Sequence, residues 1–123
     1  MEKPLLVAVI DDDESVRESL PDLLNEFGFA VQAFSSARAF LTSAHVADTR
    51  CLILDVAMPA MSGPELHKTL KLHGHAIPVI FITAQGDAGE RQKLLRNGAV
   101  ECLMKPFSEA QLLTALSAAL PVD

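Results

Sequence analysis

The sequence has only two cysteines, and no apolar run approaches the roughly 20 residues that span a membrane. Two cysteines are too few for a disulfide scaffold. Cys51 and Cys102 both lie in short apolar segments, so we expect two reduced thiols in a hydrophobic core. The N-terminal apolar run is short and is followed by four acidic residues, which is not typical of a signal peptide. We therefore expect a soluble, cytoplasmic protein.

Basic residues are in the minority, with 10 Lys and Arg against 16 Asp and Glu, which gives a formal net charge of −6. Nucleic-acid-binding domains usually have a basic footprint, so we expect no direct binding to nucleic acid, and we expect no membrane association either. The sequence has no linker, repeat or low-complexity segment. Half of its 123 residues are hydrophobic, so we expect residues 1–123 to form a single domain.

The chain does contain a regular alternation of apolar runs and amphipathic stretches. Gly28 is expected to end the first helix, a Ser62–Glu65 capping box to begin the third, and Pro121 to end the last. This alternation predicts an α/β fold in which helices cover both faces of a parallel sheet. The predicted strands are 5–10, 29–34, 51–54, 78–82 and 100–104, and the predicted helices are 16–27, 36–44, 62–73, 87–97 and 108–120.

Polar residues directly follow four of the five predicted strands. Asp11 and Asp12 follow the first strand, and the third, fourth and fifth are followed by Asp55, Thr83 and Lys105. Because parallel strands end at one edge of the sheet, we expect these side chains to share a pocket. Two carboxylates about 4–5 Å apart repel by roughly 3–4 kcal/mol, so the pocket needs a cation or a proton. Hard oxygen ligands favour Mg²⁺, for which Mn²⁺ can substitute.

The positions of the carboxylates suggest which of them bind a metal and which one reacts. Asp11 and Asp12 can supply the metal ligands, which leaves Asp55 free to act as a nucleophile and form an aspartyl phosphate. Lys105 and Thr83 can then bind oxygens of the phosphoryl group. Taken singly, each residue is more often a helix cap or a turn residue. The agreement of four strand ends favours a functional site.

Five short segments carry these residues and their neighbours: 9–14 (VIDDDE), 54–59 (LDVAMP) with 62–63 (SG), 82–84 (ITA), 97–99 (NGA) and 105–107 (KPF). Together they resemble the receiver domain of two-component response regulators, over essentially the whole chain. The details are closest to receivers that precede a LuxR-type DNA-binding domain, the NarL/FixJ-like subgroup, or to stand-alone relatives of that subgroup. The resemblance implies a flavodoxin-like (βα)5 fold, a doubly wound five-stranded parallel sheet with strand order 2-1-3-4-5.

The resemblance also implies a metal site and an acceptor. Asp55 matches the phosphoacceptor, which also contributes to the Mg²⁺ site. Asp12 matches the direct metal ligand, and Asp11 matches the neighbouring residue that usually binds through water. The backbone carbonyl of Ala57 matches the third protein ligand.

Four further positions match residues that act on the phosphoryl group. Thr83 matches the hydroxyl that turns toward it, and Lys105 matches the lysine that pairs with its oxygen. Ala84 matches a small residue that leaves room for the group. Pro106 matches the proline, often preceded by a cis bond, that aims the lysine.

One position departs from the family pattern. An aromatic residue usually stands three residues before the lysine and changes rotamer with the threonine, whereas this chain has Cys102 there. We hypothesise that coupling to the outer face is weaker, or is carried by backbone shifts of the fourth helix, whose starting segment, residues 86–93, has two glycines and little apolar content. Alternatively, Cys102 is simply a packed small hydrophobic residue.

The resemblance implies a signalling domain that catalyses only its own phosphorylation and dephosphorylation, and not an enzyme in the ordinary sense. A sensor histidine kinase or a phosphotransfer protein would donate the phosphoryl group. The face formed by the fourth helix, fifth strand and fifth helix would then change partners, including a second copy of the chain, to control an attached or separate transcriptional effector.

Two other classes of function stay open. A receiver fold can work as a binding module without phosphorylation, although the complete set of acidic, hydroxyl and lysine residues argues against it. A Mg²⁺-dependent phosphohydrolase would usually carry a second aspartate two residues after the nucleophile, where this chain has Ala57. Finally, the spacing of His67, His73 and His75 fits no compact zinc motif, so we expect these histidines on a solvated helix face.

Overall fold

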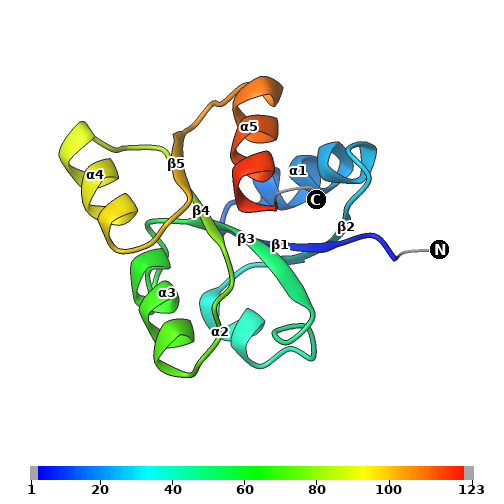
Figure 1. The fold of residues 1–123 in the computed structure, drawn as a ribbon, viewed down its shortest axis with the longest axis horizontal. Helices are drawn as coiled ribbons and strands as arrows, with labels where there is room; N and C mark the ends of the chain where they lie inside the picture. Colours follow the sequence, from blue (N-terminus) through cyan, green and yellow to red (C-terminus); the bar gives the residue numbers. More distant parts are fainter. Residues whose placement is uncertain (1–2, 121–123) are drawn as a thin grey trace.

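The computed structural model describes residues 3–120, in which five strands alternate with five helices (Figure 1). Every predicted element is present and in the predicted order. Pro121, which was expected to end the last helix, lies outside the described residues. The strands are β1 (Leu6–Ile10), β2 (Ala30–Phe34), β3 (Thr49–Asp55), β4 (Val79–Thr83) and β5 (Glu101–Met104). The helices are α1 (Glu14–Glu26), α2 (Ala37–Leu41), α3 (Gly63–Leu72), α4 (Ala88–Arg96) and α5 (Glu109–Ala119).

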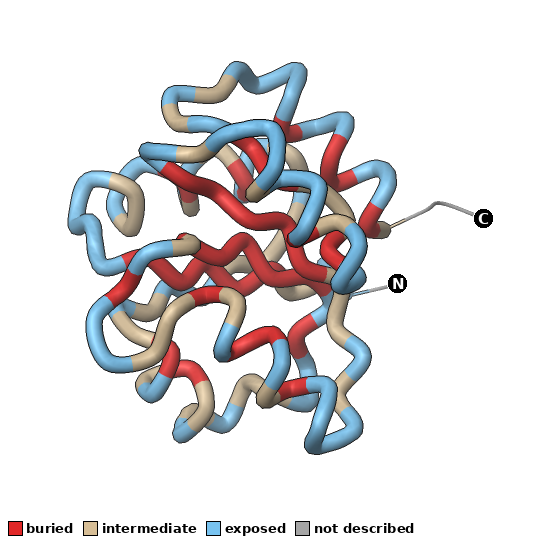
Figure 2. The backbone as a smooth tube through the Cα atoms, turned by 90° about the vertical axis from the view of Figure 1, so that its left-hand side faces the viewer, coloured by how far each residue is buried: buried red, intermediate tan, exposed pale blue. Residues whose placement is uncertain are grey.

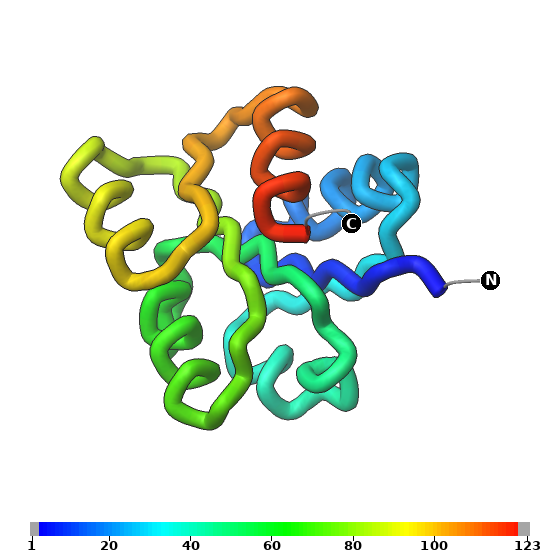
Figure 3. Tube along the Cα trace, viewed as in Figure 1, coloured from blue at the N-terminus to red at the C-terminus, as the bar shows by residue number. Residues whose placement is uncertain are grey.

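The five strands form one parallel sheet in the order β2-β1-β3-β4-β5. The strand order 2-1-3-4-5 is therefore confirmed. The winding reverses between β1 and β3, which lie side by side although they are far apart in the sequence (Figure 3). Ligands of doubly wound sheets bind at such a reversal, beyond the carboxyl ends of the strands.

Alternate strand residues fill two separate cores, one on each face of the sheet. Ala8, Leu52 and Phe81 face the core that is covered by α2, α3 and α4. Val9 and Ile53 face the opposite core, covered by α1 and α5. The central strands are accordingly buried on both sides, as Figure 2 shows, which fixes their register and the positions of their ends.

Side-chain caps set the starts of the helices. The predicted capping box is present at Ser62, and a second one is present at Ser108. The first helix begins at Glu14, two residues earlier than predicted. The reason is an N-cap: the Asp13 carboxylate accepts a hydrogen bond from the Ser15 N–H. The second helix is shorter than predicted because the Thr42 and Ser43 hydroxyls donate to carbonyls of its last turn.

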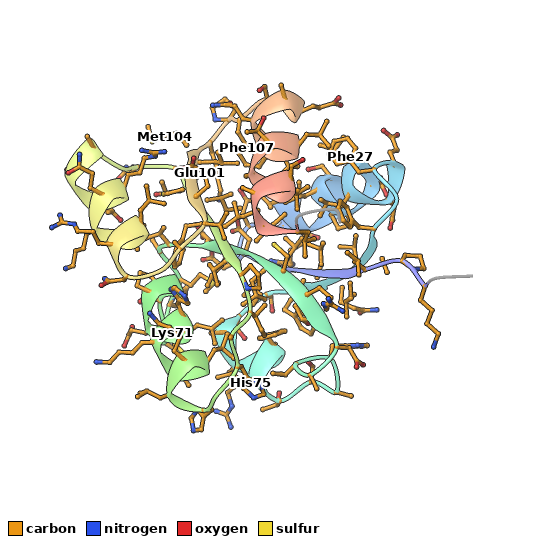
Figure 4. All side chains as sticks on the ribbon, in the orientation of Figure 1. Phe27, Lys71, His75, Glu101, Met104 and Phe107 are labelled. Atoms are coloured by element: carbon orange, nitrogen blue, oxygen red, sulfur yellow. The ribbon has the colours of Figure 1, made fainter. Side chains whose placement is uncertain are left out.

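The prediction of a solvated face for the three histidines is wrong for His67. This residue is only 7% exposed, and its ring packs edge-on against the ring of Phe81, with centroids 5.8 Å apart. His67 follows Leu66 on the inner stripe of α3, so the helix turns both toward the sheet. His73 is exposed and His75 is half-buried, near the far end of α3 (Figure 4).

Within residues 3–120, the helices are too short and too polar to cross a bilayer.

Candidate functional site

Backbone hydrogen bonds continue past the strand ends and align the residues that follow them. The Asp11 N–H donates to the Phe34 carbonyl, at 3.1 Å, and the Lys105 N–H donates to the Thr83 carbonyl, at 2.8 Å. These bonds extend the sheet by one residue at β1 and β5. The predicted site residues are therefore held by the sheet itself, which makes their relative positions rigid.

Three aspartates meet at the reversal of the sheet. Carboxylate oxygens of Asp11, Asp12 and Asp55 all lie within 4.8 Å of one another. Asp11 and Asp55 are buried, whereas Asp12 is exposed. One Asp11 oxygen accepts a hydrogen bond from the Asp13 N–H, at 2.9 Å, which orients that carboxylate. A closely spaced, all-oxygen, partly open donor set is what Mg²⁺ prefers, so these residues fit the metal.

Lys105 directly follows β5 and contacts this cluster of aspartates. Its ammonium donates to Asp11 Oδ2 at 2.8 Å and lies 3.6 Å from Asp55 Oδ1. The peptide bond between Lys105 and Pro106 is cis. The lysine therefore contacts two carboxylates that arise from different strands.

The electrostatics of the cluster favour a proton on Asp55 when no cation is bound. Burial, and then the negative charge of Asp11, raise the pKa of Asp55 from 3.8 to about 7, although Lys105 acts in the opposite direction. Burial alone would lower the pKa of Lys105, but its hydrogen bond to Asp11 and the charges of Asp11, Asp55 and Asp13 raise it overall. The pocket therefore holds an excess of negative charge that a cation would relieve.

Thr83 ends β4 at the same edge, but its hydroxyl is engaged within its own loop. The Thr83 hydroxyl donates to the Gln85 carbonyl at 2.7 Å and accepts from the Gln85 N–H at 3.2 Å. A rotation about the Cα–Cβ bond would be needed to bring the hydroxyl onto a group carried by Asp55.

A pocket of about 330 Å³ surrounds these residues. Most of the predicted site residues line it, but Cys102 and Pro106 do not. Cys102 borders a smaller hollow between α4 and β5, and Pro106 borders a groove beside α1. The predicted residues that line the pocket are Asp11, Asp12, Asp55, Ala57, Thr83, Ala84 and Lys105.

The sequence analysis gave no role in the site to three residues, although Gly63 lies in the matching segment 62–63. Arg17 donates from its guanidinium to the Asp11 carbonyl, at 3.0 Å. Gly63 packs against the end of β3, where an added Cβ would lie 2.2 Å from the Asp55 carbonyl oxygen. Glu90, from the first turn of α4, lines the pocket. Each acts through a contact between separate elements, and no local pattern in the sequence marks such a contact.

The fold and this site define a class of protein: a flavodoxin-like α/β domain with an acidic pocket at the reversal of its sheet, whose donor set is compatible with a divalent cation. The family follows from comparison with known proteins. Residues 7–117 match the model of the response regulator receiver domain, and the chain belongs to that family. The family is a signalling domain, and its members interact with histidine kinases.

Relatives of known role agree with this assignment. The response regulator protein TodT of Pseudomonas putida is 44% identical over 115 residues, which cover 94% of this chain and 51% of TodT. The transcriptional regulatory protein FixJ of Azorhizobium caulinodans is 42% identical over 120 residues, or 98% of this chain and 57% of FixJ. The predicted NarL/FixJ-like subgroup is thereby confirmed. The chain spans about half the length of these curated relatives.

Solved structures confirm the fold. The crystal structure of FixJ-N has a TM-score of 0.82 and 39% sequence identity, and the match covers 97% of this chain and 94% of that one. The response regulator StyR has a TM-score of 0.86 and 44% identity, with 97% of this chain and 60% of StyR covered.

Proposed function

We propose that this chain is a phosphorylation-controlled receiver that accepts a phosphoryl group on Asp55. The observation that carries the proposal is the convergence of three aspartates and Lys105 within one pocket at the reversal of the sheet. Cys102 is buried and does not line this pocket, so its thiol does not compete with the Asp55 carboxylate. The donor is the phosphohistidine of a sensor kinase or of a phosphotransfer protein.

The transfer step needs only groups of this chain and the donor. An Asp55 oxygen attacks phosphorus, an O–P bond forms, the donor P–N bond breaks, and the histidine leaves with its electron pair and takes up a proton. Lys105 turns from its carboxylate partners to pair with one phosphoryl oxygen, and Thr83 rotates to donate to another. Ala84 and Ala57 leave the space open because their side chains are small.

Asp11, Asp12, Asp55 and the carbonyl of Ala57 would hold Mg²⁺. When bound, this ion, or Mn²⁺ in its place, would supply charge neutralisation for the acceptor and the phosphoryl oxygens. The raised pKa of Asp55 supports the need for it, since the unassisted carboxylate is partly protonated near neutral pH. The same groups would also position water for hydrolysis, so the domain catalyses its own loading and unloading.

An apolar groove of about 450 Å³ beside the pocket supports delivery by a docked protein. Leu20, Leu23 and Phe107 line this groove, and Lys105 lines both the groove and the phosphoacceptor pocket. A kinase seated there has its phosphohistidine next to Asp55. Apolar contact at this groove would supply binding energy that small free donors lack.

We propose the face of α4, β5 and α5 as the output surface. Met104 of β5 is 52% exposed, and it lines a hollow on this face together with Arg91 of α4 and Gln111 of α5 (Figure 4). Cys102 is buried beneath it, against the core. Because a thiol is smaller than the usual aromatic ring, coupling between Thr83 and this face would be weaker or would run through the backbone of α4.

We further propose that residues 1–123 form one receiver domain that works in the cytoplasm. Two buried, unpaired cysteines suit a reducing compartment. The output is a transcriptional effector, attached or separate, as the names of the relatives suggest. DNA binding would belong to that effector, since this chain carries a net charge of −6.

Intact mass after incubation with acetyl phosphate and Mg²⁺ tests the proposal. We expect one added phosphoryl group on the wild type and none on Asp55→Asn. The matched control is Asp22→Asn, which neutralises an exposed carboxylate of α1 and should be modified like the wild type. Removal of the metal with a chelator should abolish modification.

The outcomes separate the competing functions. If a folded wild type acquires no phosphoryl group and binds no beryllofluoride, the binding-module interpretation replaces ours. An adduct on Asp55→Asn would mean that another carboxylate is the acceptor. Rapid turnover of small phosphate esters, lost in Asp55→Asn, would favour the phosphohydrolase.

A further inference from the structure

Glu90 lies between the phosphoacceptor pocket and its neighbour. It stands in the first turn of α4 and is half-buried. It lines the 330 Å³ pocket together with Asp55 and Lys105. It also lines a hollow of about 160 Å³ that is bounded by Cys102 and Met104. Glu90 is thus a fourth acidic residue around the acceptor, after Asp11, Asp12 and Asp13, and it comes from a helix and not from a strand end.

The Glu90 charge is not compensated by its neighbours. Lys105, the one cation that lines the pocket, is engaged by Asp11 and Asp55. Arg91, the next residue in the chain, points its guanidinium to Glu101, at 2.6 Å. Among residues 3–120, no hydrogen bond or ion pair engages the Glu90 carboxylate.

The Glu90 charge affects the pKa of the neighbouring Cys102 thiol. Burial, followed by the negative charges of Glu90 and Glu101, raises the pKa of the Cys102 thiol. The carboxylate is therefore close enough to act on a group beneath α4, and its link to the phosphoacceptor pocket is its position in the pocket wall. An uncompensated charge beside a partly closed pocket acts on anions that enter it, and the interaction is screened by salt.

We propose that Glu90 is a specificity-determining residue for phosphoryl transfer, which selects against free anionic phosphodonors in proportion to their negative charge. This inference rests on the proposed function and deepens it. A donor that arrives on a docked protein gains binding energy at the apolar groove and overcomes the repulsion. A free anion has no such gain, so Glu90 limits phosphorylation by small metabolites and favours a protein donor.

Two small donors of different charge test the proposal on the full chain. Acetyl phosphate is a dianion near neutral pH, whereas phosphoramidate is largely zwitterionic and carries a net charge of −1, and both phosphorylate through the same acceptor. The rates are measured by intact mass for the wild type, Glu90→Gln and Glu90→Lys. The control is Glu109→Gln, which removes an exposed carboxylate from the first turn of α5, away from the pocket.

We expect the acetyl phosphate rate to rise about two- to fivefold in Glu90→Gln and further in Glu90→Lys, with a smaller rise for phosphoramidate. The difference between donors should shrink at high salt, because screening weakens the repulsion. Glu109→Gln should match the wild type with both donors. A graded response to charge is not expected from a residue that only supports the fold.

Three results would overturn the proposal. Equal acceleration of both donors, independent of salt, would assign Glu90 a structural role. Unchanged rates in both Glu90 variants, with a wild type that is phosphorylated, would refute the role of Glu90 alone. No adduct on the folded wild type with either donor would refute the phosphoacceptor function and this inference with it.

Discussion

Asp55 combines burial, a nearby like charge and a single lysine, and each of these acts on its protonation. Its side chain shares the pocket with Asp11, and Lys105 contacts both carboxylates. Since Lys105 bonds more closely to Asp11, at 2.8 Å against 3.6 Å, it only partly offsets the cost of ionising Asp55. The acceptor is therefore a destabilising residue in the metal-free protein, as is common for functional sites.

Replacing this carboxylate should stabilise the metal-free protein above neutral pH. The folded-state pKa of Asp55, about 7, lies above its ordinary value of 3.8. The stability contributed by the bound proton is thus fully present below pH 3.8 and is lost as pH rises through about 7. In Asp55→Asn this loss is absent, and we expect a gain of about 1–2 kcal/mol at alkaline pH after allowing for solvent screening.

Urea unfolding in the presence of a chelator measures this gain as a function of pH. The advantage of Asp55→Asn over the wild type should shrink steadily toward pH 4. Asp22→Asn provides the control for a carboxylate in solvent. A pH-independent difference between Asp55→Asn and the wild type would contradict the raised pKa.

His67 should make the protein sensitive to acid. Burial, and then the positive charge of Lys71, lower the pKa of His67 from its ordinary value of 6.5. The folded state therefore binds fewer protons than the unfolded chain. The stability from the neutral ring is fully present above pH 6.5 and is lost as pH falls through the lower folded-state pKa. We expect His67→Gln to lack this acid-dependent loss.

Thermal unfolding across the acidic range checks this expectation. The control is His73→Gln, which changes an exposed imidazole at the end of the same helix and should keep the pH profile of the wild type. Identical profiles for all three proteins would contradict the lowered pKa of His67 in the folded state.

At the scale of elements, the end of β3 and the start of α3 meet without space for a side chain. The Gly63 N–H donates to the Val56 carbonyl at 2.9 Å. A Cβ at Gly63 would lie 2.2 Å from the Asp55 carbonyl oxygen and 3.0 Å from the Phe81 ring. Since the nearest atom is backbone, the strand end itself would have to move.

Gly63→Ala should therefore destabilise the protein by about 2–4 kcal/mol and slow phosphorylation, because it displaces Asp55. Urea unfolding and the acetyl phosphate rate measure the two effects. Gly89→Ala is the matched control, since Gly89 lies in exposed α4 and the nearest atom to an added Cβ is 3.4 Å away. It should stabilise by about 0.5–1 kcal/mol through helix propensity. Equal effects of both changes would contradict the steric argument.

Elements and strand-end residues could be predicted from the sequence because their signals are local. Asp55 and Thr83 directly follow apolar runs, and Ser62 begins a capping box. The orientation of Thr83 toward the Gln85 carbonyl had no local signal, since it depends on the conformation of a loop. The burial of His67 was not predicted, because the sequence pattern around Leu66 is equally compatible with an exposed and with a buried histidine at this position.

At the scale of the whole molecule, one sheet links the pocket to the proposed output face. The β4 strand ends at Thr83 in the pocket, and β5, which pairs with it, carries Met104 toward solvent. Lys71 of α3 also donates to the Asn97 carbonyl at the end of α4, which ties these two helices together. The end of α4 is thus held by α3 and its first turn by the Arg91–Glu101 ion pair to β5, and a change at Asp55 has a short path through β4 and β5 to the face that holds Met104.

If this face forms a homodimer upon phosphorylation, Met104 is the residue to change. It borders a hollow of about 480 Å³ between α4, β5 and α5, and its thioether is largely exposed. In a two-fold dimer, the Met104 side chain of each copy would be buried in the interface. Met104→Lys would replace both side chains with ammonium groups that repel each other. We expect beryllofluoride with Mg²⁺ to convert the wild type to a dimer in light scattering, and Met104→Lys to weaken that dimer at least about tenfold.

Leu72→Lys is the control, because Leu72 is 75% exposed at the far end of α3. A dimer weakened equally by both changes would place the interface elsewhere, and a monomer under all conditions would leave this face to a different protein partner.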